Sequence, residues 1–407
     1  MPNSRPLRRA VHASAKSLKT AWCIVGVSLL TIVAIDFGLR LLFFAKDTLL
    51  DKPQKQWWGV FQDYQSDDRQ AEPWQIKYEK EYADTWREEW HSYVYWRRPP
   101  YHGECINIDA DGIRRTWQDP LLAATPKTSR KRVFVFGGST IWGTGARDDY
   151  TIPSFLAKQL ADHGVSAEVI NFGESGYVST QEVLTLLLRL QRDDIPDLVV
   201  FYDGFNDTFM TYQGRDVGAA MNESHRRAEF NLLKDPSRIR TEFLKQIPEY
   251  LQGFTRVASG LRRRLGDSSD SATWPSLSEV DEQRLSDAVI QNYDANIRIV
   301  ESLGASYGFA CRFFWQPDVF TKLAPADSES ARISQQQGCK RFFLATHAKV
   351  RHRQVLSNQS DFEDISAVFD DVRGPVFLDF AHVTEEANRL IAQRMLPAVA
   401  ATVKIDR

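Results

Sequence analysis

Four short motifs contain the residue types used in ester chemistry: a serine after two glycines, a glycine-rich turn, an asparagine, and an aspartate three residues before a histidine. A serine hydroxyl becomes a nucleophile when a histidine takes its proton and a carboxylate orients that histidine. The set therefore predicts acyl transfer through a serine. The motifs are Gly137-Gly138-Ser139-Thr140, Asn171-Phe172-Gly173-Glu174-Ser175-Gly176, Asp203-Gly204-Phe205-Asn206-Asp207 and Asp379-Phe380-Ala381-His382.

Each part of such a site has a candidate residue. Ser139 is the expected nucleophile, because the two glycines before it permit a sharp turn and close approach of a substrate. His382 is the expected general base, and Asp379 would accept its other ring N–H. The backbone N–H groups of Ser139 and Gly176 and the side chain of Asn206 would form the oxyanion hole.

Two further residues are candidates for the border of a pocket, since both lie just beyond strand ends. They are Trp142 and Gln316, and packing or capping is the alternative explanation for each. His347 and His352 are five apart, which places them on different faces of a helix, and no cysteine pair has zinc-site spacing. We therefore expect no metal site and no cofactor.

The elements that would position these residues begin near residue 131, where apolar runs alternate with helical patterns. Near-continuous apolar strands are typical of a parallel sheet covered on both faces. Ligands bind beyond the carboxyl ends of such strands, so the motifs should meet at one edge. Strands are expected at Arg132–Phe136, Ala167–Asn171, Asp197–Tyr202, Phe309–Trp315 and Val376–Leu378, and helices at Ile152–His163, Thr180–Leu190, Val280–Leu303, about 329–350, about 354–370 and Thr384–Val403.

The ordered motifs resemble the SGNH (GDSL-like) hydrolase superfamily over roughly residues 130 to 403. The resemblance implies an α/β fold with a three-layer, open, flavodoxin-like parallel sheet flanked by helices, and the site roles given above. Gly204-Phe205-Asn206-Asp207 matches the third block well, whereas the second block leaves Gly173 as an alternative oxyanion donor to Gly176.

One departure from the family is the glycine at position 138, where the family name has aspartate. Glycine there occurs in membrane-anchored relatives associated with extracellular polysaccharides, and it leaves open how the nucleophile turn is braced. The α/β-hydrolase alternative is excluded, because its G-x-S-x-G elbow would need glycine where this chain has Ile141.

The N-terminus predicts a membrane anchor. A basic segment is followed by sixteen uncharged residues, Thr20–Ile35, and apolar character continues to Phe44. Asp36 and Arg40 are four apart and could pair on one helix face. No A-x-A cleavage pattern follows, so a signal anchor is favoured over a cleaved signal peptide, and a buried soluble helix is the remaining alternative. The basic N-terminus would be cytoplasmic and the catalytic domain extracytoplasmic, in the periplasm.

The expected organisation is a cytoplasmic tail (1–19), a transmembrane signal anchor (20–44), an aromatic-rich juxtamembrane region (45–128) and a hydrolase-like domain (129–407) with an insertion at about 208–280. In the second region, four aromatic residues at a spacing of four predict a helix that packs on the catalytic domain or lines a sugar-binding cleft: Tyr78, Tyr82, Trp86 and Trp90. Residues 107–114 predict a hairpin turn rather than a calcium loop. The insertion is either a helical lid or a surface decoration.

Together these features predict a membrane-anchored, extracytoplasmic serine esterase that removes small O-acyl groups, such as acetyl, from carbohydrate through an acyl-enzyme. The alternatives are an O-acetyltransferase in cell-surface polysaccharide assembly and a catalytically silent scaffold of an envelope complex. The expected partners are an acylated carbohydrate or another ester, the membrane, and an envelope protein. A net charge of −2 argues against a nucleic-acid partner.

Overall fold

The computed structural model describes residues 5–49, 61, 72–126, 130–232, 250–264, 277–356 and 361–403. The chain divides into two compact units. One contains residues 1–57 and 225–272, and the other contains residues 58–224 and 273–407. The domain boundaries expected at residues 19, 44 and 128 remain predictions.

The larger unit is built on a five-stranded parallel sheet with the order β6-β5-β7-β8-β9. Four of its strands match the predicted strands within one residue at each end. The predicted α/β class is therefore confirmed. The strands are β5 (Lys131–Gly137), β6 (Ala167–Asn171), β7 (Leu198–Asp203), β8 (Ala310–Trp315) and β9 (Phe362–Asp364).

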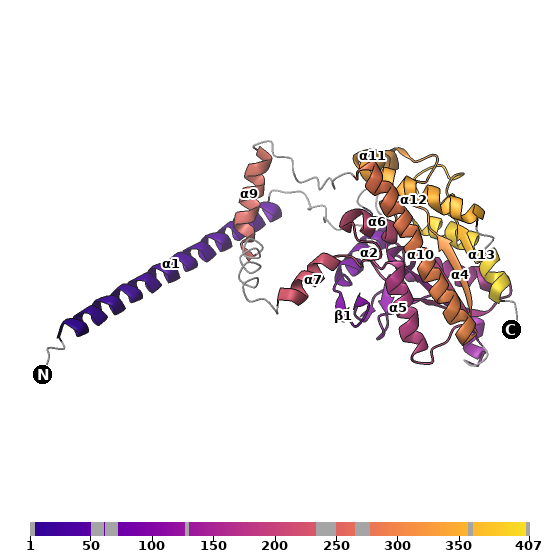
Figure 1. The fold of residues 1–407 in the computed structure, drawn as a ribbon, viewed down its shortest axis with the longest axis horizontal. Helices are drawn as coiled ribbons and strands as arrows, with labels where there is room; N and C mark the ends of the chain where they lie inside the picture. Colours follow the sequence, from indigo (N-terminus) through magenta and orange to yellow (C-terminus); the bar gives the residue numbers. More distant parts are fainter. Residues whose placement is uncertain are drawn as a thin grey trace. The chain divides into compact units, whose positions relative to one another are not determined.

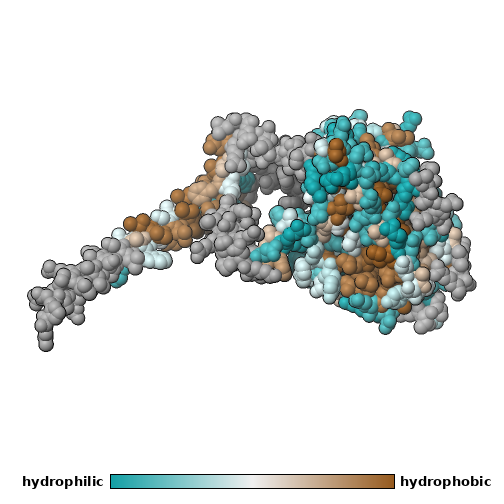
Figure 2. Space-filling model, in the orientation of Figure 1, coloured by the Kyte–Doolittle hydropathy of each residue, from teal (hydrophilic) through white to brown (hydrophobic). Residues whose placement is uncertain are grey.

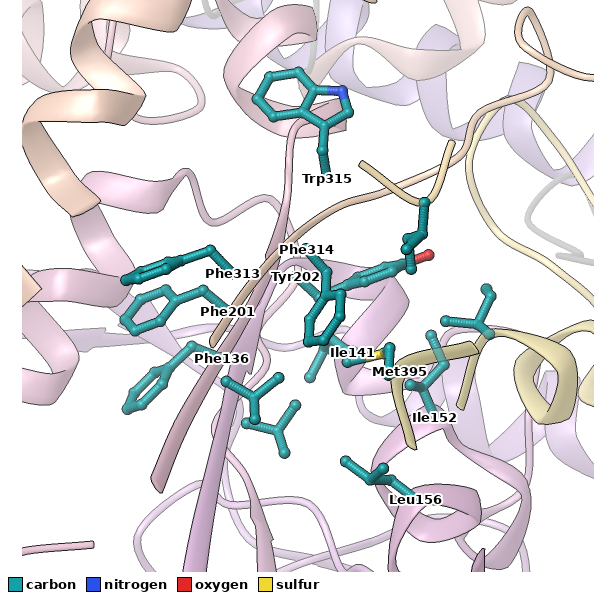
Figure 3. Close-up of a cluster of buried hydrophobic side chains, with 14 of the residues drawn as sticks. Phe136, Ile141, Ile152, Leu156, Phe201, Tyr202, Phe313, Phe314, Trp315 and Met395 are labelled. Atoms are coloured by element: carbon teal, nitrogen blue, oxygen red, sulfur yellow. The ribbon is translucent and has the colours of Figure 1, made fainter. Parts of the chain in front are cut away.

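Side chains on both faces of this sheet are buried, as the apolar runs required. On one face Phe136, Phe201 and Phe313 stack across three strands, with ring centroids 4.9 and 5.5 Å apart in successive pairs (Figure 3). On the other face, Ile141 packs with Ile152 and other residues of the flanking helices (Figure 3). The core thus fixes the strand ends at which the motifs lie.

Helices cover the sheet in two layers. The two that pack closely together against β6, β7 and β8 are α4 (Ile152–Asp162) and α13 (Glu385–Val403) (Figure 1). The opposite layer is formed by α5 (Ser179–Leu190), α10 (Glu279–Tyr307), α6 (Phe205–Gly214) and α12 (Gln337–Leu356). Shorter helical segments of this unit are α3 (Ser139–Trp142), α11 (Asp327–Gln335) and the 3₁₀ turns η2 (Pro120–Ala124) and η4 (Asp148–Tyr150), whereas most of α7 (Glu223–Leu232) belongs to the smaller unit.

The last predicted strand, Val376–Leu378, is wrong. These residues are buried, but they form only an isolated bridge between Phe377 and Val383 and no part of the sheet. Their backbone N–H groups are instead bound by a side chain, because Glu329 Oε1 accepts from Val376 and Phe377. The edge strand is β9, which lies in the segment predicted as a helix over about 354–370, and the helix predicted over about 329–350 is divided between α11 and α12.

The aromatic-rich region preceding the sheet contains α2 (Pro73–Asp84) and two short antiparallel pairs. Tyr78 and Tyr82 of α2 are buried, which supports packing on the catalytic unit. The prediction that all four aromatic residues lie on one helix is wrong, however, because Trp86 follows the helix and Trp90 lies in a strand. The predicted turn over 107–114 is confirmed, since Asp109 N–H donates to the Ile113 carbonyl. The strands are β1 (Glu89–His91), β2 (Tyr95–Arg97), β3 (Tyr101–His102) and β4 (Asn107–Ile108).

The smaller unit contains α1 (Arg5–Leu49) and α9 (Gln252–Arg264). Within α1, Lys19–Lys46 is long and apolar enough to cross a membrane, with a mean hydropathy of 2.1 (Figure 2). The predicted pairing of Asp36 and Arg40 is confirmed at 2.6 Å. Asp36 Oδ1 also accepts from the N–H groups of Gly253 and Phe254, so it satisfies donors at the N-terminus of α9.

That contact changes how the predicted insertion over about 208–280 is understood. Its first described helix, α6, packs against α10 and α12 and is part of the catalytic core. Its later helix, α9, packs against α1 in the smaller unit. Residues 233–249 and 265–276 lie outside the described residues. The lid therefore stays a prediction.

Arg114 joins the aromatic-rich region to the segment that follows the candidate nucleophile. Its guanidinium is buried and lies 3.0 Å from Asp148 Oδ1. It also donates to the backbone carbonyls of Trp142, Gly143 and Ala146. The first two carbonyls belong to the last residue and the C-cap of the one-turn helix α3, and the third lies in the turn that follows it. Through these bonds, a residue that lies outside the five-stranded sheet holds α3 in place.

Replacing Arg114 by methionine is expected to lower the free energy of unfolding by about 3–5 kcal/mol, because the buried Asp148 loses its closest cation and keeps only the half-exposed Arg115, at 4.0 Å. The neighbouring Arg115 is half-exposed, so Arg115→Met serves as the matched control and should change stability by less than about 1 kcal/mol. Urea unfolding of both variants measures the difference. Equal, small effects would contradict the structural role of Arg114.

Candidate active site

The structure brings Ser139, His382 and Asp379 together in a continuous hydrogen-bonded series. Ser139 Oγ lies 2.7 Å from His382 Nε2. His382 Nδ1 lies 2.5 Å from Asp379 Oδ2. The serine hydroxyl can therefore donate to Nε2 while Nδ1–H donates to the carboxylate. This is the geometry in which imidazole removes a proton from serine.

The loop carrying Asp379 and His382 is organised by the aspartate itself. Asp379 Oδ1 accepts from the backbone N–H groups of Ala381 and His382, at 2.9 and 2.8 Å. Desolvation raises the pKa of Asp379, but the charge and hydrogen bond of His382 and these two N–H groups lower it, and the net pKa lies below its ordinary value. The carboxylate is thus ionised at neutral pH and can stabilise an imidazolium.

Ser139 begins α3 directly after β5. A Cβ at Gly137 would lie 2.8 Å from the Tyr202 carbonyl oxygen, so the chain needs glycine to turn there. A Cβ at Gly138 would lie 2.2 Å from Asn206 Nδ2. The glycine that departs from the Gly-Asp-Ser pattern therefore leaves space for Asn206 beside the nucleophile.

The three expected oxyanion donors occupy the same edge of the sheet. Asn206 Nδ2 donates to the Tyr177 carbonyl at 2.7 Å, which orients the amide, and an amide NH₂ keeps a second donor. Gly176 adopts a left-handed conformation with φ +73°. The alternative donor, Gly173, already donates its N–H to Asn171 Oδ1 at 2.9 Å. The geometry therefore favours Gly176 over Gly173.

The two residues predicted to border a pocket are both buried. The Trp142 ring lies between two guanidinium groups, 3.8 Å from Arg98 Cζ and 4.3 Å from Arg114 Cζ, so it packs rather than facing a pocket. Gln316 accepts from Thr140 Oγ1 at 3.4 Å, next to the nucleophile. The pocket expectation is wrong for Trp142, and Gln316 supports the segment that carries the nucleophile.

Comparison with known proteins gives similarity to solved structures alone, since no family model and no curated protein matches. A carbohydrate acetylesterase family member from Sinorhizobium meliloti has 18% identity and a TM-score of 0.34, covering 68% of this chain and 100% of that one. A G-D-S-L family lipolytic protein from Veillonella parvula has 11% identity and a TM-score of 0.36, with coverage of 66% and 97%. A mutant acetyl-xylooligosaccharide esterase from Geobacillus has 12% identity and a TM-score of 0.32, with coverage of 68% and 95%.

At these identities and TM-scores, the similarities do not show which reaction this chain catalyses. The deciding observation is the chain's own geometry, in which Ser139, His382 and Asp379 form one hydrogen-bonded series beside a parallel sheet of order β6-β5-β7-β8-β9. This chain has the parallel sheet and the serine–histidine–aspartate geometry that the SGNH resemblance predicts. Its four motifs meet at one edge of the sheet, although the fourth follows a buried loop rather than a strand.

Side chains of α11 and of the loop before it hold that fourth motif. Glu329 and Lys322 form a fully buried ion pair of 2.8 Å. Lys322 Nζ donates to the Gly374 carbonyl, and Arg332 Nη1 donates to the carbonyls of Phe377 and Asp379 at 3.1 and 3.4 Å. These bonds replace the neighbouring strand that the predicted sheet would have provided.

The sequence analysis missed these supporting residues. Glu329 stands at the third position of α11, where its Oε2 accepts from the Ala326 N–H at 2.8 Å. Glutamate at that position indicates a helix start and nothing more. Its bonds to Val376 and Phe377, 47 and 48 residues further on, leave no local pattern in the sequence.

Buried carboxyl groups also lie behind the third motif. Burial raises the pKa of Asp203 to about 8 and raises that of Glu182, which is hydrogen-bonded to it, well above its ordinary value. Burial therefore favours the neutral form of both carboxyls. Asp207 accepts from Ser179 Oγ at 2.6 Å, and Asn296 Nδ2 donates to the same hydroxyl at 2.8 Å. This network fixes α5 and α6 behind Asn206.

The hydrolase variant Glu329→Gln is expected to lose about 3–5 kcal/mol of stability, because Lys322 stays buried without a counter-charge. Its kcat should fall more than its KM rises, since the loop carrying His382 loosens. Glu386→Gln, an exposed change on α13, is the control. Unchanged stability and kcat in Glu329→Gln would contradict the holding role.

The stability difference between wild type and Glu329→Gln should also depend on pH. Desolvation raises the pKa of Glu329, but Lys322 and three backbone N–H groups lower it, so the net folded-state pKa is below its unfolded value. Its contribution is therefore present above pH ~4.5, the ordinary carboxyl range, and is lost as pH falls through the lower folded pKa. Thermal unfolding from pH 3 to 7 measures this, and a constant difference would contradict it.

Proposed function

We propose that this chain is an SGNH-type serine esterase that works through an acyl-enzyme. The observation that carries the proposal is the series Ser139–His382–Asp379, with contacts of 2.7 and 2.5 Å. A serine, imidazole and carboxylate at these distances and in this order form the standard arrangement for nucleophilic acyl transfer.

In the proposed mechanism, Ser139 Oγ attacks the ester carbonyl carbon while His382 Nε2 takes the hydroxyl proton. The N–H groups of Ser139 and Gly176 and the Asn206 amide bind the negative oxygen of the tetrahedral intermediate. Collapse breaks the C–O bond to the alcohol, and His382 returns the proton to that alcohol. Water, deprotonated by His382, then attacks the acyl-serine and releases the carboxylic acid.

The substrate class we propose is a small O-acyl ester, such as acetate, on a carbohydrate. It follows from the resemblance of the motifs to polysaccharide-associated members of the superfamily. Some solved structures of similar fold are described as carbohydrate or acetyl-xylan esterases, which guides the choice of test substrate only.

We further propose that the enzyme is anchored in a membrane through Lys19–Lys46 with its catalytic unit outside the cytoplasm. The apolar helix supports the anchor, since 28 residues exceed the ~20 that a bilayer requires. The basic residues that precede it in the sequence support a cytoplasmic N-terminus by the positive-inside rule.

The first test uses the full chain in detergent micelles and follows acetate release from an aryl acetate. Ser139→Ala should lower kcat by ~10⁴-fold or more. It should also abolish labelling by an activated phosphonate. Ser302→Ala, an exposed serine on α10, should keep full activity. Retained activity in Ser139→Ala would exclude the proposed nucleophile.

The same assay with an added oligosaccharide acceptor separates hydrolysis from transfer. Free acetate as the sole product supports the esterase. Acyl-sugar formation that depends on the acceptor would instead establish the O-acetyltransferase. A folded protein that neither turns over ester nor reacts with the phosphonate would identify the silent scaffold.

Asn206→Ala tests the oxyanion hole separately from the nucleophile. Removing one such donor is expected to lower kcat by ~10²–10³-fold with little change in KM, because the donor binds charge that develops in the transition state. Phosphonate labelling of Ser139 should persist at a reduced rate. A KM effect with unchanged kcat would show that Asn206 binds the ground state instead.

A further inference from the structure

The larger unit contains a cavity that is lined by none of the residues of the proposed mechanism. Its volume is about 200 Å³. It is bounded by strands β1 and β2, the turn at Asp111-Gly112 and the C-terminal half of α5. Four arginines line the cavity, which makes its charge unusual: Arg97, Arg98, Arg189 and Arg192.

Arg97 is the central observation. Its side chain is only 6% exposed. Both terminal guanidinium nitrogens, Nη1 and Nη2, are buried with no hydrogen-bond partner, and no ion pair joins this arginine to a carboxylate within the described residues. Its contact with the Tyr177 ring, at 5.7 Å, supplies only a fraction of what such a charge requires. A buried, unpaired charge is costly unless a counter-ion completes the site.

The neighbouring arginines show what a completed site looks like. Arg98, the next residue, faces Glu174 and donates to Ser175 Oγ at 2.8 Å. Arg189 lies 3.1 Å from Asp111 and 3.6 Å from Asp194. Arg97 has no such carboxylate, so its counter-ion must come from outside the described chain.

The other groups around the cavity do not neutralise the charge of Arg97. His91 Nδ1 is buried without a hydrogen-bond partner. Burial lowers the pKa of His91, and so do the positive charges of Arg97, Arg192 and Arg189. The lining carboxylates do not compensate Arg97, since Asp111 pairs with Arg189 and Glu89 is exposed.

The cavity also has an aromatic wall. Trp90 lines it and is 70% exposed, although it is one of the largest apolar side chains. An exposed indole offers a rigid face for a flat ligand, and a guanidinium fork matches a carboxylate in bidentate geometry. A sugar ring that carries a carboxylate satisfies both requirements at once.

We propose that this cavity binds the carboxylate of an acidic sugar residue, with Arg97 as its counter-ion and Trp90 against the ring. As a statement about substrate, this rests on the proposed function, because it assigns an anionic glycan to the esterase. Binding itself requires neither Ser139 nor His382.

Strand β2 connects this cavity to the candidate active site. Trp96 Nε1 donates to the Ser175 carbonyl at 2.9 Å, and Arg98 binds the Ser175 hydroxyl. Arg97 stands between these two residues. A ligand on Arg97 would therefore bind next to the strand that supports the turn carrying Gly176, as a second binding site for the same glycan.

The test is calorimetric binding to the full-length Ser139→Ala protein in detergent micelles. The probes are tri-galacturonate, the neutral xylotriose and inorganic sulfate. Tri-galacturonate should bind, and Arg97→Met should weaken it by 10-fold or more, with Arg97→Lys intermediate. Arg87→Met, an exposed arginine near β1, removes the same charge and should leave binding unchanged.

Arg97→Met is expected to fold, because removing an unpaired buried charge does not destabilise a protein. If it does not fold, Arg192→Met, an exposed change at the same cavity, should still weaken binding by several-fold. Equal affinity of Arg97→Met and wild type would overturn the proposal. Sulfate binding as tightly as tri-galacturonate would overturn the sugar assignment.

The test is independent of the proposed reaction. Acetate release by the otherwise wild-type protein is measured separately on an uncharged aryl ester, which needs no second site. Failure of uronate binding with intact hydrolysis overturns only this inference. Binding of uronate without any hydrolysis overturns only the esterase.

Discussion

The arrangement of this site depends on one buried ion pair, Lys322–Glu329. The histidine and aspartate of the proposed triad lie on a loop that no neighbouring strand supports. Glu329 takes over that task by accepting the backbone N–H groups of Val376 and Phe377. Because both partners are fully buried, the carboxylate cannot exchange these bonds for water. The loop carrying His382 is thereby fixed to within hydrogen-bond distance of a serine 243 residues away.

The segment that carries the nucleophile is also held by a buried charged side chain that binds backbone groups. Helix α3 is a single turn, too short to satisfy its own terminal carbonyls, and Arg114 binds them. Arg114 comes from the aromatic-rich region before the sheet. That region is consequently part of the catalytic unit rather than a spacer between membrane and enzyme. A single change in it can alter the active site without touching a triad residue.

Arg97 belongs to the same set of arginines, but its terminal guanidinium nitrogens have no hydrogen-bond partner among the described residues. Arg98 and Arg114, close by in sequence, both have buried carboxylates that compensate their charge. The contrast between neighbours with the same charge and similar burial is what distinguishes a structural arginine from one that awaits a ligand.

The sequence by itself determined four of the five strands and the choice of the candidate site residues. Strand runs are local, and parallel strands place their carboxyl ends at one edge, so the order of the motifs along the chain is enough to predict that Ser139, Gly176 and Asn206 lie close together. The loop that carries Asp379 and His382 was predicted to follow a strand at Val376–Leu378. This segment has the composition of a strand but does not pair with any strand of the sheet. Only the tertiary structure decided what holds that loop, which glycine offers a donor, and which arginine lacks a partner. Those outcomes depend on contacts between residues tens of positions apart, which leave no periodic pattern in a sequence.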